Sequence, residues 1–105
     1  MKYCELVVYV PASHAEAVKR ALFAAGAGRL GNYDGCCFSV AGTGEFRPLD
    51  GSSPFIGEPG RRETVAEVRL EMICPAENIG RIVAALKKAH PYETPAFHYY
   101  PVGIE

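Results

Sequence analysis

The sequence predicts an α+β domain in which four strands and two helices follow one another in the order β-α-β-β-α-β. Three observations lead to this prediction: segments rich in β-branched and aromatic residues, two segments with apolar residues at helical spacing, and prolines and glycines between them. A length of 105 residues fits one domain, and we expect residues 1–105 to form it. In this order the strands form an antiparallel sheet with both helices on one face, which is the ferredoxin-like arrangement.

The first half of the chain contains a strand, a helix and a second strand. Residues 3–10 are rich in β-branched and aromatic side chains, as is typical of a strand. Ser13 and Glu16 have the spacing of a capping box, in which each side chain satisfies a free donor at a helix start. The helix is expected to run to about Ala25, and the second strand to cover residues 36–41.

The second half repeats the strand and helix. Residues 62–73 alternate between two sets of side chains, which predicts a long strand with two distinct faces. Pro75 suits the first turn of the helix that follows, and Lys87 and Lys88 lie at its C-terminal end, where positive charge is favourable. The last strand is expected over residues 96–102.

The sheet face without helices has a mixed composition. It is predicted to carry Tyr3, Glu5, Val7, Tyr9, Val65, Glu67, Arg69 and Glu71. Apolar and charged side chains together suggest a surface that another subunit partly covers. The alternative is a solvated face with a few aromatic residues.

A long segment over residues 42–60 is rich in glycine and proline and is expected to be a loop. Such loops are uncommon in compact domains and are usually functional. Phe46, Pro54, Phe55 and Ile56 make this one unusually apolar. Because exposed apolar loops usually cover something, we expect it to contact a neighbouring subunit, with a ligand site in the cleft between subunits.

Composition excludes several kinds of protein. A net charge of −1 disfavours nucleic acid as the main partner, since nucleic-acid binding needs surplus positive charge. No apolar run reaches the ~18 residues of a membrane span. Glu5 lies where a signal peptide would be apolar, so a cytoplasmic location is expected. The four cysteines form no C-x-x-C pair, and Cys36 and Cys37 are interpreted as small buried hydrophobes, with reactivity left open.

The run from residue 90 to residue 95 contains two prolines, which hold an imidazole, a phenol and a carboxylate in a stiff connection. His90 and Glu93 lie three residues apart, and His98 follows on the next strand. These three are candidate ligands for a divalent metal ion, and Tyr92 is a candidate ligand-binding residue. The structural alternative is that Glu93 accepts backbone N–H bonds in the turn while His90 caps the helix end in its charged form.

Gly42, Thr43 and Gly44 could let backbone N–H groups approach a small anion, with Arg47 nearby as a counter-charge. The segment lacks the Lys-Ser/Thr pair of a P-loop. The alternative is that these glycines allow a bend or bulge in a strand.

Four segments in consistent order resemble a known family. Residues 42–48, 54–57, 63–71 and 90–96 are similar to the central insert domain of the NIF-three-like (NGG-one-interacting factor, YqfO-type) proteins. That insert is itself similar to the CutA and PII families, whose ferredoxin-like domains usually form trimers. The two-metal site of full-length NIF-three-like proteins is on flanking halves that have no counterpart here. The resemblance therefore implies a stand-alone, trimeric module with a regulatory or structural role, and no metal ligand or hydrolase activity is carried over.

The residues and the resemblance together favour a non-enzymatic, oligomeric binding or regulatory module. It would bind a divalent metal or a small anion at subunit clefts. The alternatives are a small metal-dependent enzyme that uses His90 and Glu93, and a scaffold that binds another protein through an exposed sheet edge.

Overall fold

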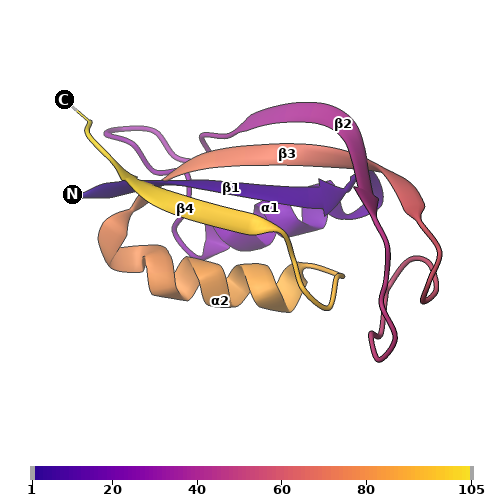
Figure 1. Ribbon diagram of the computed structural model, residues 1–105. Helices are drawn as coiled ribbons and strands as arrows, with labels where there is room; N and C mark the ends of the chain where they lie inside the picture. Colours follow the sequence, from indigo (N-terminus) through magenta and orange to yellow (C-terminus); the bar gives the residue numbers. More distant parts are fainter. Residues whose placement is uncertain (1, 105) are drawn as a thin grey trace.

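The computed structural model describes residues 2–104 and contains the expected four strands and two helices (Figure 1). The elements are β1 (Tyr3–Pro11), α1 (Ala15–Ala24), β2 (Phe38–Phe46), β3 (Glu63–Pro75), α2 (Ile79–Ala89) and β4 (Phe97–Val102). Short 3-10 turns, Ala12–His14 and Ala76–Asn78, precede the two helices. The predicted fold class is confirmed.

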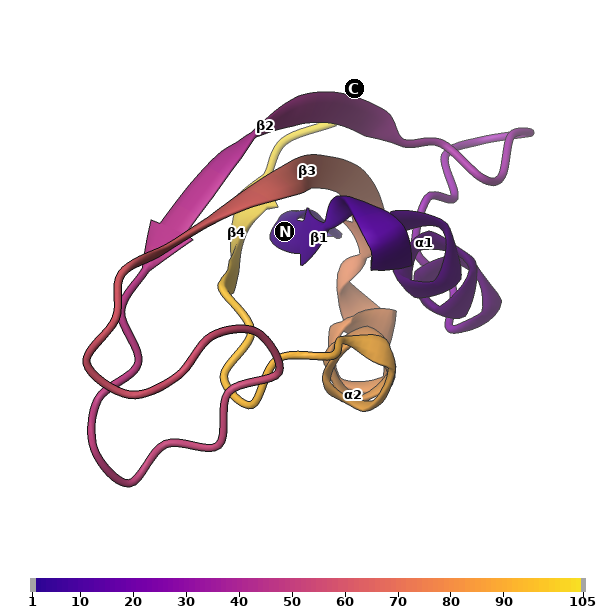
Figure 2. The same cartoon turned by 90° about the vertical axis from the view of Figure 1, so that its right-hand side faces the viewer.

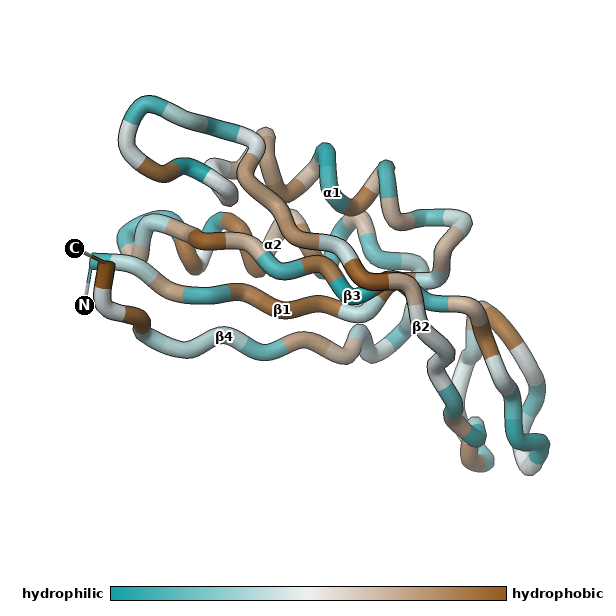
Figure 3. Tube along the Cα trace, turned by 90° about the horizontal axis from the view of Figure 1, so that it is seen from above, coloured by the Kyte–Doolittle hydropathy of each residue, from teal (hydrophilic) through white to brown (hydrophobic). Residues whose placement is uncertain are grey.

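The strands form one sheet in the order β2-β3-β1-β4, and every neighbouring pair is antiparallel. Both helices lie on the same side of this sheet (Figure 2). The central strand β1 carries a run of hydrophobic residues, and β2 and β3 continue together beyond one end of the other two strands (Figure 3). This is the ferredoxin-like arrangement that the order of elements predicted.

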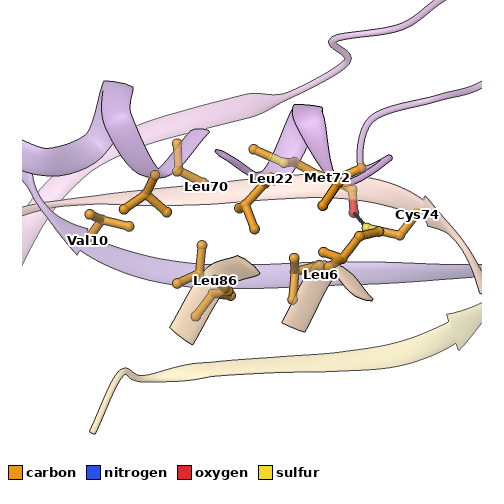
Figure 4. Close-up of a cluster of buried hydrophobic side chains, with 12 residues drawn as sticks. Leu6, Val10, Leu22, Leu70, Met72, Cys74 and Leu86 are labelled. Atoms are coloured by element: carbon orange, nitrogen blue, oxygen red, sulfur yellow. Dashed lines mark hydrogen bonds between the residues drawn. The ribbon is translucent and has the colours of Figure 1, made fainter. Parts of the chain in front are cut away.

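The hydrophobic core fills the space between the sheet and the helices (Figure 4). Every second residue of β1 and β3 faces the helices, and these side chains meet an apolar stripe on each helix. Fully buried members include Leu6, Val8, Val10, Val18, Leu22, Leu70, Met72, Ile82 and Leu86. Each such side chain contributes about 1.5–3 kcal/mol by leaving water.

The opposite face of the sheet carries the side chains that the alternation predicted. The β1–β3 register pairs Val7 with Glu71 and Tyr9 with Arg69, so these residues share the open face. The β2–β3 register adds Phe38, opposite Glu71. Phe38 is 64% exposed, whereas Val7 is fully buried although no helix covers it.

The prediction for the second strand and the loop after it was wrong in its boundaries. Residues 42–46 belong to β2, which pairs with β3 as far as Phe46, and the connecting loop covers only residues 47–62. Glycines weaken a strand on their own, but here the alternating β3 supplies the ladder partner for each of them. The pairing with β3, which no local pattern in residues 42–46 encodes, therefore extends the strand.

The predicted capping box does not form. The 3-10 turn Ala12–His14 moves the start of α1 to Ala15, and His14 becomes the residue before the helix. The Ser13 hydroxyl lies 2.8 Å from His14 Nδ1. In the same way Pro75 ends β3 instead of standing in the first turn of α2. No helix within residues 2–104 is long and apolar enough to cross a membrane.

Candidate functional site

Two loops meet at the end of the sheet where β2 and β3 project (Figures 1 and 2). They are the β2–β3 loop (residues 47–62) and the α2–β4 loop (residues 90–96). Between them lies a cavity of about 250 Å³. It is lined by Glu45, Phe46, Pro48, Ser52, Pro54, Phe55, Ile56, Glu67, Tyr92, Glu93, Thr94 and Ala96.

The peptide groups of Tyr9, near the end of β1, hold the α2–β4 loop at both ends. The Tyr9 N–H donates to the carbonyl of Ala96 at 3.1 Å. The Tyr9 carbonyl accepts a bond from His90 Nε2 at 2.7 Å. Because β1 is a central strand, these two bonds attach the loop to the middle of the sheet.

His90 is a neutral link between β1 and its own loop. Its Nδ1 accepts the N–H of Tyr92 at 3.1 Å, so Nε2 carries the proton that is donated to Tyr9. Burial of the ring lowers the pKa of His90, although the Tyr9 carbonyl and Glu67 act in the opposite direction. His90 does follow the last residue of α2, as predicted. Its ring bonds β1 and its own loop, and burial, which lowers its pKa, favours the neutral form over the charged form that was predicted.

Tyr92 joins the α2–β4 loop to β2, β3 and the β2–β3 loop. Its hydroxyl donates to Glu67 Oε2 at 3.1 Å. Its ring meets Phe46 at 5.6 Å and Phe55 at 6.4 Å between centroids. Partial burial and the neighbouring Glu67 carboxylate raise the pKa of Tyr92, so the phenol stays protonated and keeps donating.

Gly44 leaves the space that the Glu67 side chain needs. A Cβ atom at this position would overlap the Glu67 carboxylate, whereas a Cβ at Gly42 would meet nothing within 4 Å. The Glu67 side chain therefore crosses the backbone of β2 on its way to the Tyr92 hydroxyl. This close approach explains the second glycine of the Gly42-Thr43-Gly44 segment.

Glu93 ties the two loops together directly. Its Oε2 accepts the backbone N–H of Ser53 at 3.1 Å. The prediction that Glu93 accepts a backbone N–H was therefore correct in kind, but the donor is in the other loop and not in the turn itself. The β2–β3 loop is also closed at its base, where the Gly60 N–H donates to the carbonyl of the buried Pro48 at 2.8 Å.

The structure brings together some of the predicted site residues and separates others. Tyr92 and Glu93 line the cavity, and His90 supports it from behind. Gly42, Thr43 and Gly44 line a shallower depression on the open face, together with Tyr9, Val40, Ala41, Glu67 and Arg69. Arg47 is in neither set of lining residues. His98 lies on β4 with its ring stacked on Tyr100, at 6.3 Å between centroids.

The candidate metal ligands do not converge. Within residues 2–104 no group of three His, Cys, Asp or Glu side chains is placed to hold a metal ion. Both ring nitrogens of His90 are engaged by backbone groups, and His98 is on the exposed face of an edge strand. A metal ion bound to these residues stays a prediction.

The cysteines in the structure are all free thiols. Cys36 and Cys37 are only half-buried, whereas Cys4 and Cys74 are buried opposite each other on β1 and β3. Burial raises the pKa of the Cys74 thiol to about 12, which makes it a poor nucleophile.

Sequence reasoning missed the role of Glu67 and Ser53 in the cavity. The alternation of β3 correctly placed Glu67 on the open face of the sheet, but it did not predict the hydrogen bond between Glu67 and Tyr92. A signal was available in the pattern of β2, where two glycines in a five-residue stretch leave room for a long side chain from the next strand. No comparable signal exists for Ser53, whose contact with Glu93 spans 40 residues.

A cluster of charged residues occupies the middle of the open face. The Arg69 guanidinium lies 5.8 Å from the centre of the Tyr9 ring and donates to Glu71 at 3.2 Å. Its Nε is buried and makes no hydrogen bond within residues 2–104. Partial burial, reinforced by Glu71, raises the pKa of the nearby Glu5 carboxyl, although Arg69 opposes the shift.

Sequence similarity to known proteins covers almost the whole chain. No protein-family model matches it. It is 50% identical over 102 residues to a protein of Mycobacterium tuberculosis (strain ATCC 25618 / H37Rv) named GTP cyclohydrolase 1 type 2 homolog, covering 92% of this chain and 27% of that one. A protein of the same name from Bacillus subtilis (strain 168) is 50% identical over 98 residues, covering 93% and 26%. The chain thus spans about a quarter of the length of these curated relatives.

Solved structures agree with this result. A Bacillus cereus protein related to NIF3 is 45% identical and superposes with a TM-score of 0.81 over 95% of this chain and 25% of that chain. The chain is related to one segment of the NIF3-related proteins. The predicted resemblance to the NIF3-like proteins is therefore confirmed. The periplasmic divalent cation tolerance protein CutA of Archaeoglobus fulgidus is 16% identical, with a TM-score of 0.67 over 98% of this chain and 86% of that one, and shows that the fold is shared.

Proposed function

We propose that this chain is a ligand-binding or regulatory module whose ligand site is the cavity between the β2–β3 loop and the α2–β4 loop. NIF3-related and CutA-like relatives support a small non-enzymatic or regulatory module. The observation that carries the proposal is the joining of the two loops over a cavity, by the Tyr92–Glu67 and Glu93–Ser53 bonds. A concave, largely apolar site with a few fixed polar groups is the usual form of a small-molecule site.

The chemistry around the cavity supports binding more than catalysis. His90 is the group in this region best suited to move a proton near neutral pH, but both of its ring nitrogens are engaged by Tyr9 and Tyr92. Tyr92 and Glu67 bind each other. These side chains therefore hold the loops in place and are not free to transfer protons to a substrate.

We further propose that copies of the chain associate through the open face of the sheet, and that the assembly is a trimer. On this face Phe38, Val40 and Tyr100 are 64%, 45% and 45% exposed. Several large exposed apolar side chains on one face are typical of interaction surfaces. The depression beside Gly42 and Arg69 lies on the same face and would be part of a cleft between copies.

Two measurements test the proposal. Sedimentation equilibrium should give the mass of an oligomer at micromolar concentration. Backbone-amide NMR spectra, recorded with divalent metal salts, phosphate and small neutral and charged organic molecules, should show saturable shifts at Ser53 and Tyr92 for at least one of these ligand classes. A monomer would contradict the association, and amide signals that respond to no class of ligand would contradict the binding site.

A further inference from the structure

We propose that the cavity recognises a small organic cation, an alkylammonium or guanidinium group on a short apolar body. This inference rests on the proposed binding site and names the class of ligand that the site accepts. The cation would lie against the aromatic rings of the cavity with its charge directed toward Glu67 and Glu93.

Three aromatic residues line the cavity. Phe46, Phe55 and Tyr92 all line it, and each comes from a different segment of the chain. The Phe46 and Phe55 rings are inclined to Tyr92 by 61° and 51°. The three rings line the same cavity, and a cation within about 6 Å of the face of an aromatic ring is attracted to it.

All the charged residues that line the cavity are acidic. Glu45, Glu67 and Glu93 are among the lining residues, which include no lysine, arginine or histidine. Glu45 pairs with Arg62 at 3.2 Å in an exposed contact. The hydrogen bonds that Glu67 and Glu93 accept come from neutral donors, the Tyr92 hydroxyl and the Ser53 N–H.

Two carboxylates with neutral donors in a partly enclosed space favour a positively charged ligand over an anion. The phenylalanine and proline side chains of the lining supply no metal-ligating atoms, but they do supply apolar surface for a carbon chain. A cation with a short hydrocarbon body uses both features. A volume of about 250 Å³ limits the ligand to a small molecule or one side chain.

The test uses three probes of nearly equal size on the full chain at constant ionic strength: n-butylammonium, 1-butanol and butyrate. Amide shifts are followed by NMR. We expect saturable shifts at Ser53 and Tyr92 with n-butylammonium, and affinity at least about tenfold weaker for 1-butanol and for butyrate. Equal affinity for 1-butanol, or no saturable shift with n-butylammonium, would overturn the inference. Shifts with 1-butanol or butyrate alone would leave the proposed binding site standing, whereas no shift with any probe, metal salt or phosphate would remove both.

Glutamate-to-glutamine variants then test which carboxylates interact with the bound cation. Glu67→Gln and Glu93→Gln should each weaken n-butylammonium binding about fivefold, because a neutral amide replaces a charged acceptor. Glu58→Gln is the matched control, since it changes the net charge equally from an exposed position in the β2–β3 loop, outside the cavity lining. Equal weakening in all three variants would indicate long-range attraction only and contradict a specific site. Glu93 is exposed, so its variant is expected to fold even if Glu67→Gln does not.

Discussion

His90 connects three parts of the backbone through one neutral ring. We expect His90→Ala to lower the free energy of unfolding by about 2–4 kcal/mol, because it leaves the Tyr9 carbonyl and the Tyr92 N–H without their partners. Urea denaturation measures this loss. His98→Ala is the control, because His98 is exposed, and should change stability by no more than about 0.5 kcal/mol. Equal effects of the two substitutions would show that the bonds of His90 contribute little.

The lowered pKa of His90 also predicts how stability depends on pH. In the unfolded chain this histidine titrates near its ordinary pKa of about 6.5, whereas burial lowers the pKa in the folded chain. The unfolded state therefore binds the proton more readily. The stabilisation from neutral His90 is fully present above the unfolded pKa and is lost as the pH falls from there through the folded pKa.

Comparison of the wild type with His90→Gln isolates this contribution from those of other titrating groups. Between pH 7 and pH 5 the stability of the wild type should fall more steeply than that of the variant. Parallel pH profiles would contradict a neutral, buried His90.

Gly42 and Gly44 offer a matched pair of substitutions. Gly44→Ala should push the Glu67 carboxylate away from the Tyr92 hydroxyl and cost about 0.5–1.5 kcal/mol, the usual net value of one hydrogen bond. Gly42→Ala meets open space, so it should be neutral or slightly stabilising. Thermal and urea unfolding of both variants would check this, and an equal loss in the two would exclude the proposed role of Gly44.

At the scale of the elements, the β2–β3 loop depends on the α2–β4 loop for its position. Tyr92→Ala removes the ring that Phe46 and Phe55 contact, together with the bond to Glu67. Trypsin should then cut after Arg61 or Arg62 several times faster than in the wild type, since a loop that opens more often is cleaved more often. Tyr33→Ala serves as the control, because Tyr33 is 76% exposed in another loop. An unchanged cleavage rate would mean that the β2–β3 loop keeps its position without the contacts of Tyr92.

The regular elements were predictable because their patterns are local. The alternation of residues 62–73 fixes which side chains of β3 face the helices, and the apolar spacing of α2 fixes its buried stripe. The end of β2 was not predictable in the same way, because Gly42 and Gly44 have low strand propensity and depend on pairing with β3. The start of α1 was misplaced because a 3-10 turn precedes the helix.

The candidate site was predictable only in part. The prolines of residues 90–95 predicted a stiff loop with candidate ligand-binding residues, and Tyr92 and Glu93 of this loop do line the cavity. The contacts of the loop, however, are with residues distant in the chain. Tyr9 to His90 spans 81 residues, and Ser53 to Glu93 spans 40. Such contacts follow from the register of the sheet and the folding of the loops, which local spacing does not encode.

At the scale of the whole molecule, the apolar loop is covered partly by its own chain. Phe46 and Ile56 are half-buried beside the α2–β4 loop, whereas Phe55 is 51% exposed. The Phe55 ring packs against the His14 ring, with 5.2 Å between the ring centroids. From the sequence we expected a second copy of the chain to cover this loop. Exposed apolar side chains also lie on the open face of the sheet, among them Phe38 and Val40.

Association through the open face can be tested by adding charge there. Phe38→Glu places a carboxylate opposite Glu71 and should convert the proposed oligomer to a monomer, as measured by light scattering. Leu49→Glu, at a position 63% exposed in the β2–β3 loop, is the control and should leave the assembly intact. If Leu49→Glu gave a monomer and Phe38→Glu did not, the interface would lie on the β2–β3 loop instead.

The anchoring of the α2–β4 loop by the peptide groups of Tyr9 has a consequence for protein engineering. The side chain at position 9 can be varied without breaking these bonds, because the bonds to His90 and Ala96 use only the main-chain atoms of Tyr9. Proline is the exception, since it has no N–H to donate to Ala96. A combinatorial library that randomises position 9 while excluding proline should therefore keep the cavity wall in place and alter only the chemistry of the opposite surface.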